Sequence, residues 1–176
     1  MLETHFMTAT ATQETLFLIG GAPEVGKTTF RKLMSEYTEL PGGSCSDVVY
    51  AIMATRTGKT VEELRAMPKS ELRPKLVELG NAICDADPAY LVRYLYERGV
   101  RIVDGIRRKE ELAAVLKEFS CVGVWIVNPR AAVVTDNTEL TAADFPIVIQ
   151  NDGTVDELAL KVADFAIRHR KKWLSS

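Results

Sequence analysis

One stretch near the start of this chain constrains its fold more than any other: an apolar run, then a glycine-rich loop, then a helical pattern. Residues 16–20 read Leu-Phe-Leu-Ile-Gly, and Gly21, Gly26, Lys27 and Thr28 follow with the spacing Gly-x4-Gly-Lys-Thr. In such a loop the backbone N–H groups turn inward around a phosphate, and the lysine reaches the outer phosphates. The stretch therefore predicts a strand, a phosphate-binding P-loop and the helix that the loop opens.

The helix after the loop supports this interpretation. Phe30, Leu33, Met34 and Tyr37 recur at the spacing of one helical face, which would pack on a sheet. The positive end of the helix dipole then points at a bound anion, and we expect the phosphates of ATP there, with the Thr28 hydroxyl on Mg2+. The residues expected to bind the nucleotide are Gly21, Ala22, Pro23, Glu24, Val25, Gly26, Lys27, Thr28 and Thr29.

Composition narrows the class of protein. A chain of 176 residues with 47% apolar and 26% charged residues suits one globular domain, expected over residues 13–176 after a flexible leader at 1–12. A net charge of −2 gives no field that would hold a nucleic acid polymer. No apolar run approaches the roughly 18 residues of a membrane span, and no export signal begins the chain, so we expect a cytoplasmic protein.

The three cysteines, Cys45, Cys84 and Cys121, are odd in number and lack the spacing of metal ligands. Reduced thiols that behave as small buried apolar side chains are therefore expected.

Further apolar segments predict the rest of a sheet. Strands are expected at residues 100–105, 121–127 and 146–149, with a weak one near 43–45. Strands that alternate with helices indicate a parallel sheet covered on both faces, with the ligand at the carboxyl ends of the strands. The fold class predicted is α/β, a three-layer α/β/α P-loop NTPase fold with a parallel sheet of about five strands.

Between the second and third strands lies a stretch, residues 47–98, in which every pattern is helical. A capping box begins at Thr60, and Ser70 would cap a longer helix with Pro74 in its first turn. Another helix is expected over residues 88–98, after an Asp-Pro start signal. These residues form a helical insertion in the sheet domain.

Asp104 ends the strand at residues 100–105, where a P-loop protein places the acid that reaches Mg2+ directly or through water. The alternative is an aspartate that only shapes the turn before Gly105. Because Gly105 follows, the glutamate that motor ATPases use to activate water is absent, and no Asn-Lys-x-Asp guanine motif occurs. The chain therefore resembles a transferase more than a hydrolase or a GTPase switch.

Arginines provide the remaining candidates. Arg107 and Arg108 are expected to begin the helix after Asp104, where two cations oppose the helix dipole unless they meet a phosphate. Arg107 would hold such a phosphate or neutralise transition-state charge, and it is predicted to be catalytic with Lys27 and Asp104. Arg73, Arg93 and Arg130 are further candidates for an acceptor site, each with the alternative of a solvated surface residue.

Several motifs together resemble the phage-type deoxynucleoside monophosphate kinases, P-loop enzymes of the adenylate-kinase-like fold. They cover residues 16–165 and follow the same order as in that family. They are the P-loop, an Arg-x2-Leu-x2-Leu-Gly element at Arg73 to Gly80 followed by Asp87-Pro88, Asp104 with Arg107 and Glu110, Asp136-Asn137-Thr138-Glu139, and the turn Asn151-Asp152-Gly153-Thr154.

The resemblance implies ATP-dependent transfer of a phosphoryl group to a nucleoside or deoxynucleoside monophosphate in host cytoplasm. The insertion at 47–98 would bind the acceptor, and residues 127–145 would form a short lid. The resemblance adds Asn151 and Gly153 on the nucleotide side. The acceptor residues expected are Ser46, Arg73, Gly80, Arg93, Arg107, Arg130 and Glu139.

Two other functions stay open at this point. One is a kinase of another small metabolite, similar to dephospho-coenzyme-A kinases. The other is a nucleotide-binding regulatory protein without turnover, which a lid segment with a single arginine, Arg130, would permit. Whether the protein is a monomer or a homodimer is not fixed by any pattern.

Overall fold

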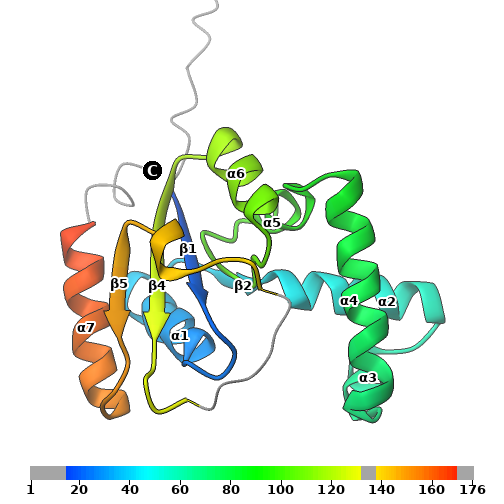
Figure 1. Ribbon diagram of the computed structural model, residues 1–176, viewed down its shortest axis with the longest axis horizontal. Coiled ribbons are helices and arrows are strands. Elements are labelled where there is room, and N and C mark those ends of the chain that lie inside the picture. Colours follow the sequence, from blue (N-terminus) through cyan, green and yellow to red (C-terminus); the bar gives the residue numbers. More distant parts are fainter. Residues whose placement is uncertain (1–14, 132–137, 170–176) are drawn as a thin grey trace, which may run out of the picture.

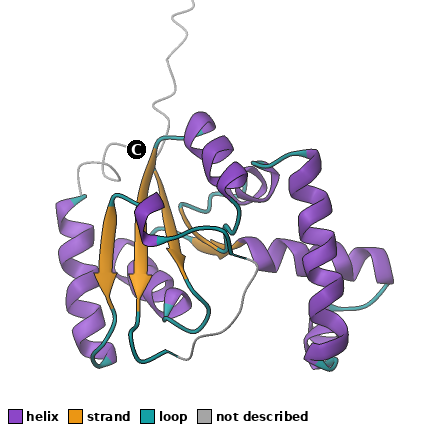
Figure 2. Ribbon diagram, viewed as in Figure 1, coloured by secondary structure: helices purple, strands orange, loops and turns teal. Residues whose placement is uncertain are grey.

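The computed structural model describes residues 15–131 and 138–169. In this part of the chain five parallel strands form one sheet in the order β2-β3-β1-β4-β5, which confirms the α/β class and the parallel sheet (Figures 1 and 2). The strands are β1 (Leu16–Gly21), β2 (Gly42–Ser44), β3 (Ile102–Asp104), β4 (Cys121–Val127) and β5 (Ile147–Gln150). The expected leader, residues 1–12, lies outside the described residues.

Helices connect the strands and form the insertion. They are α1 (Lys27–Thr38), α2 (Cys45–Thr57), α3 (Val61–Ala66), α4 (Lys69–Ala86), α5 (Tyr90–Tyr96), α6 (Lys109–Glu118) and α7 (Val155–Arg168), with a short 3-10 helix at Ala142–Asp144. Figure 1 shows α2, α3 and α4 extending to one side of the sheet, as an arm of the molecule. None of the helices in the described ranges is both long and apolar enough to cross a membrane.

β1 is the centre of the core, because all of its residues are buried. Leu16 and Leu18 pack on one face with side chains of α5 and α6, whereas Phe17 and Ile19 pack on the other with α1 and α7. This alternation is the period of two that a strand imposes on its side chains. The three layers predicted from the sequence follow from it.

The order of the strands creates the crevice for a ligand. β3 and β4 pair with opposite edges of β1. The connection after β1 leads to β2 on one side of it, whereas the connection after β3 leads to β4 on the other side. An open parallel sheet binds its ligands at such a switch point. The P-loop follows β1 at this end, and Asp104 at the end of β3 pairs in register with Ile19.

Local signals set most helix boundaries, with small corrections. The capping box at Thr60 is confirmed, with Glu63 N–H donating to Thr60 Oγ1 at 3.1 Å. α4 begins at Lys69 instead of after Ser70, so Pro74 lies inside the helix and not in its first turn. Pro74 is exposed, which lets water satisfy the Ser70 carbonyl that loses its helical donor.

Two other helices also start later than predicted. α5 begins at Tyr90 instead of at residue 88, and Asp87 accepts a hydrogen bond from Ala89 N–H just before it. α6 begins at Lys109, with Arg108 as its N-cap residue, so Arg107 lies in the loop that precedes the helix.

Candidate functional site

The predicted P-loop turns sharply between β1 and α1. Glu24 and Gly26 adopt left-handed φ angles of 63° and 99°, and Gly26 is the N-cap of α1. Lys27 Nζ donates to the carbonyl oxygens of Gly21 at 2.7 Å and Ala22 at 2.5 Å. The loop therefore holds the lysine charge inside its own curve, next to the N-terminus of α1.

Asn151, which follows β5, contacts this loop and stabilises it through a hydrogen bond. Its Nδ2 donates to the Val25 carbonyl at 2.8 Å, and a Cβ atom at Gly26 would lie 2.4 Å from the same Nδ2. A residue with a side chain at position 26 would push Asn151 away. The structure thus brings Asn151 to the glycine-rich loop, whereas Gly153 lies at the capping box of α7, with its Cα facing Glu157.

Asp104 is buried and paired with a cation that the sequence analysis did not identify. Arg31 Nε donates to Asp104 Oδ2 at 2.8 Å, and the two side chains are 15% and 6% exposed. Gly42 makes room for this pair, because a Cβ there would lie 3.0 Å from Arg31 Cγ. Arg31 lies one turn after Lys27 on α1. This position on the helix after the loop was the only feature of the sequence that could have pointed to a role for Arg31 at the site.

Thr28 and Asp104 offer oxygen atoms that suit Mg2+, an ion that would arrive bound to the nucleotide. Mg2+ takes oxygen ligands, and it commonly uses one or two protein groups together with phosphates and waters. The described ranges contain no cluster of three or more His, Cys, Asp or Glu side chains that would hold a metal without the nucleotide. Because Arg31 already occupies one Asp104 oxygen, contact through water suits this site better than direct ligation.

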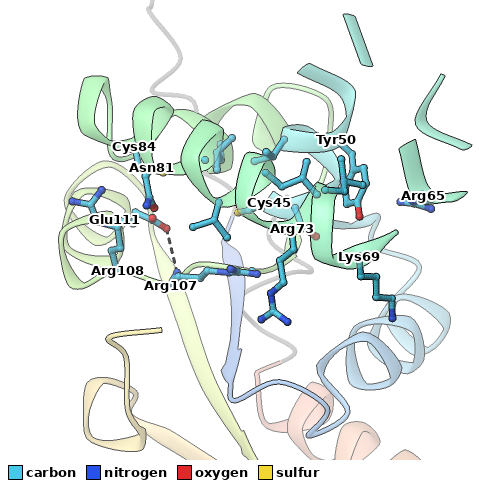
Figure 3. A pocket seen from close by; sticks show the side chains of 18 of the residues that line it. Cys45, Tyr50, Arg65, Lys69, Arg73, Asn81, Cys84, Arg107, Arg108 and Glu111 are labelled. Atoms are coloured by element: carbon cyan, nitrogen blue, oxygen red, sulfur yellow. Dashed lines mark hydrogen bonds between the residues drawn. The ribbon is translucent and has the colours of Figure 1, made fainter. Parts of the chain in front are cut away.

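A pocket of about 350 Å³ opens between the insertion and the sheet (Figure 3). Its walls come from α2, α3, α4 and α5, the loop before α6 and the first turn of α6. Apolar side chains form much of the wall, and charged groups gather at both ends. The lining residues are Cys45, Ser46, Val49, Tyr50, Arg65, Met67, Lys69, Leu72, Arg73, Leu76, Val77, Gly80, Asn81, Cys84, Leu91, Gly105, Arg107, Arg108 and Glu111.

Four predicted acceptor residues meet in this pocket: Ser46, Arg73, Gly80 and Arg107. Figure 3 shows Arg107 extending across the pocket toward Arg73, which comes from α4. Ser46 is at hydrogen-bond distance from Ser44, with the two Oγ atoms 2.9 Å apart. A Cβ at Gly80 would make only ordinary contact, 3.7 Å from Val49 Cγ2, so larger side chains there would fill the pocket.

Three other predicted acceptor residues do not line the pocket. Arg93 was expected beside the acceptor, but its guanidinium is held by Asp87 at 2.5 Å and Glu118 at 2.5 Å. The helix face that carries Arg93 therefore turns toward α6 and not toward the pocket. Glu139 accepts from Lys109 N–H at 3.4 Å, and its own N–H donates to the Arg107 carbonyl, so it supports the Arg107 loop.

Arg130 is an exposed residue after β4. The pKa of Asp152 is lowered mainly by its hydrogen bond with Lys161, and the charge of Arg130 adds a smaller lowering. It is not among the residues that line the pocket. Of the expected lid, residues 132–137 lie outside the described ranges, and with them Asp136 and Asn137 of the family-like motif.

Arg108 and Glu111 line the pocket without having been predicted to bind the acceptor. Arg108 makes ion pairs at 2.6 Å with both Asp85 and Glu110, which ties α6 to α4. These two carboxylates offset the unfavourable position of the Arg108 charge at the start of α6, so no phosphate is needed to explain it. Glu111 is 8% exposed, and its Oε2 accepts from Arg107 N–H at 3.2 Å.

The pocket thiols are protonated at neutral pH. Burial, and then the charges of Glu111 and Asp104, raise the pKa of Cys45 well above its ordinary value. Burial and Glu111 raise the pKa of Cys84 to about 12. Because only a thiolate attacks efficiently, neither cysteine is arranged as a nucleophile.

Comparisons with known proteins support the fold. No protein-family model and no curated protein matches the sequence. Among solved structures, shikimate kinase from Aquifex aeolicus VF5 is similar with a TM-score of 0.53 and 13% identity, over 88% of this chain and 97% of that one. A presumed kinase from Chloroflexus aurantiacus J-10-fl has a TM-score of 0.50 and 13% identity, over 89% and 98%. At these identities the likeness concerns the arrangement of strands and helices: this chain has the α/β fold of those kinases.

Proposed function

We propose that this protein transfers a phosphoryl group from ATP to a small-molecule acceptor, and that the acceptor is a nucleoside or deoxynucleoside monophosphate. One observation carries the proposal: a pocket lined by Arg73 and Arg107 opens at the same sheet edge as the P-loop. The loop accounts for the donor's phosphates, and the pocket accounts for a second, separate ligand. Both are needed for transfer between two bound molecules.

The residues divide between the two substrates. The P-loop N–H groups and Lys27 hold the outer phosphates of ATP, and Asn151 keeps the loop in shape. Mg2+ bound with the nucleotide, near Thr28 and Asp104, would neutralise charge on the transferred group. Arg107 lies on the acceptor side and would stabilise charge that develops between the substrates. No covalent intermediate on the protein is required, in keeping with the protonated thiols.

The chemistry of the pocket favours a monophosphate as acceptor. Two arginine side chains approach each other at one part of it, and planar guanidinium groups bind phosphate oxygens in pairs. Beside them, Val49, Leu72 and Leu76 offer an apolar wall suited to a flat ring. An acceptor with a phosphate at one end and a ring at the other matches both features.

A second candidate is a hydroxyl-bearing metabolite. The similarity to shikimate kinase motivates it, together with Asp104, whose carboxylate is paired with Arg31 beside the pocket residue Gly105. A carboxylate in that place would take the proton from an attacking hydroxyl. A monophosphate needs no such base, because its oxygen is already ionised. The two candidates therefore differ in whether Asp104 is required beyond its role near Mg2+.

The experiment is a coupled assay for ADP with ATP, Mg2+ and a panel of acceptors. The panel holds the ribo- and deoxyribonucleoside monophosphates and a set of phosphate-free sugars, hydroxy acids and nucleosides, with Lys27→Ala as the background control. Turnover with a monophosphate supports the proposal. Turnover only with phosphate-free acceptors supports the second candidate. Tight ATP binding without turnover on any acceptor would identify a nucleotide-binding protein without transferase activity.

A further inference from the structure

We propose that Glu111 reads the end of the acceptor that lies farthest from its phosphate, and that it selects a nucleobase with adjacent N–H donors. This inference rests on the proposed function, because it assumes that the pocket takes a nucleotide. It goes further in naming the chemical class of base. Guanine fits that class best, and uracil and thymine fit it worst.

Glu111 is unusual among the charged residues that line the pocket because it is buried. The residue is 8% exposed and comes from the first turn of α6. One oxygen accepts Arg107 N–H at 3.2 Å, and the carboxylate interacts with the neighbouring Cys84, whose pKa it helps to raise. A carboxylate offers about four acceptor sites, so these two contacts leave capacity for further donors.

The nearest cations in sequence do not neutralise Glu111. Arg108 directs its guanidinium to Asp85 and Glu110, and Lys109 lies 3.8 Å from Asp144. Within the described ranges no arginine or lysine forms an ion pair with Glu111. A charge that is buried without a cation is costly unless hydrogen-bond donors surround it. A ligand that brings N–H groups to this end of the pocket would supply them.

The pocket has two chemically different ends. Asn81 and Cys84 are three residues apart on α4 and line the pocket on the side of Glu111. In Figure 3 these three side chains gather at one side, whereas Arg73 and Lys69 lie toward the other. Arg107 leaves its backbone beside Glu111 and extends away from it. A phosphate at the arginine end is kept from the carboxylate by charge repulsion, which directs the base to Glu111.

The edges of the nucleobases differ in what they offer a carboxylate. Guanine presents a ring N–H and an exocyclic amino group side by side, which match two carboxylate oxygens. Cytosine and adenine present one amino group next to a ring acceptor. Uracil and thymine present one N–H between two carbonyl oxygens, which the carboxylate repels. The Asn81 amide at the same end would donate to the guanine carbonyl oxygen.

The test measures binding, so it does not depend on turnover. Isothermal titration of the Mg2+-free protein with guanosine and inosine monophosphates isolates one group, because these ligands differ only in the exocyclic amine. Uridine monophosphate is the third ligand. The wild type should bind guanosine monophosphate about tenfold or more tightly than inosine monophosphate, as expected for a hydrogen bond to a charged acceptor.

Glu111→Gln is the decisive variant, because it keeps one oxygen for Arg107 N–H, removes the charge and turns the other acceptor oxygen into an NH2 donor. It should bring the affinity ratio of the guanosine to the inosine ligand close to one and raise the affinity for uridine monophosphate. Glu110→Gln is the matched control: this neighbour is exposed and does not line the pocket, so the ratio should stay as in the wild type. Thermal unfolding of each variant checks that the fold is intact.

The outcomes separate the two levels of the proposal. If the wild type binds the three ligands equally, or if Glu111→Gln leaves the ratio unchanged, the base-reading role is wrong while the acceptor class stands. If no monophosphate binds although ATP does, the acceptor class itself is wrong and the inference falls with it. The wild-type ratio needs no variant, so equal binding of the three ligands would overturn the base-reading role even if Glu111→Gln were unstable.

Discussion

The two sides of the candidate site are built in opposite ways. The nucleotide side is one contiguous loop, closed by contacts from Lys27 to its own carbonyls and braced by Asn151. The proposed acceptor side is assembled from the four helices of the insertion, the loop before α6 and the first turn of α6, which are far apart in sequence. The first side depends on local backbone shape, whereas the second depends on tertiary packing.

This difference has a functional consequence. A change in the loop should affect transfer to every acceptor alike, because all acceptors use the same donor. A change in the pocket should affect the use of the acceptor and leave ATP binding intact.

Lys27→Ala should lower turnover by about 10²–10³-fold with any acceptor, because it removes a fixed charge from the phosphate site. The fold should be unchanged, since Lys27 is only partly buried and contacts its own loop. Steady-state assays and thermal unfolding measure the two effects. Lys32→Ala, an exposed lysine on the same helix, is the control. Normal turnover by Lys27→Ala would remove the P-loop from the reaction.

Asp104→Asn should destabilise the protein by about 3 kcal/mol, because it leaves the largely covered guanidinium of Arg31, whose side chain is 15% exposed, without its counter-charge. It should also raise the Mg2+ concentration needed for half-maximal turnover. Denaturant unfolding and a magnesium titration measure the two effects separately.

The double variant Arg31→Met with Asp104→Asn distinguishes a metal role from a purely structural one. Removing both charges should recover most of the stability, since buried ion pairs are often replaceable by apolar groups. The Mg2+ requirement should stay high if Asp104 reaches the metal. If the magnesium titration of the double variant returns to the wild-type curve when its stability is recovered, Asp104 acts only in the ion pair with Arg31.

Sequence patterns predicted the local structure around the glycine-rich loop well because its signals are local. The apolar run of β1, the glycines of the loop and the capping boxes at Thr60 and Thr154 act over a few residues, and the structure has each of them. The parallel sheet followed from strands that alternate with helices. The Arg31–Asp104 pair was missed because it joins residues 73 positions apart, and no local pattern marks such a contact.

Arg73→Ala should raise the acceptor KM by roughly tenfold to a hundredfold and leave the ATP KM unchanged, because a charge-assisted contact is worth about 1.5–3 kcal/mol. Arg73→Lys should recover only part of the loss, since a point charge does not reproduce the planar guanidinium. Lys75→Ala, which is exposed on the same helix and does not line the pocket, is the control. An equal rise in both KM values would place Arg73 outside the acceptor site.

The acceptor side shows where sequence patterns reach their limit. Arg73 and Arg93 look alike in sequence, each a lone arginine on a helix. Arg73 lines the pocket, whereas Arg93 pairs with Asp87 and Glu118, and only the packing of α5 against α6 decides this. Glu111 likewise had the signature of an ordinary first-turn acid, and its burial depends on the neighbouring α4.

Arg93→Ala should have the smallest effect. It should lower the free energy of unfolding by about 1 kcal/mol or less and leave the acceptor KM unchanged, whereas Arg73→Ala changes the acceptor KM. The expected loss of stability is small because the side chains of Arg93, Asp87 and Glu118 are each about one-third exposed, at 34%, 37% and 35%. Urea unfolding and the acceptor KM measure the two effects. A tenfold rise in the acceptor KM would return Arg93 to the binding site.

The pH dependence of this loss identifies the interaction responsible. Hydrogen bonds from Arg93 hold the pKa of Asp87 below its ordinary value of 3.8. A lowered pKa in the folded state adds stability above the unfolded value and loses it as pH falls through the folded one. The difference between wild type and Arg93→Ala should therefore be constant at neutral pH and shrink below about pH 4. A difference that persists at low pH would point to lost packing of the arginine stem instead, because that contribution does not depend on the charge of Asp87.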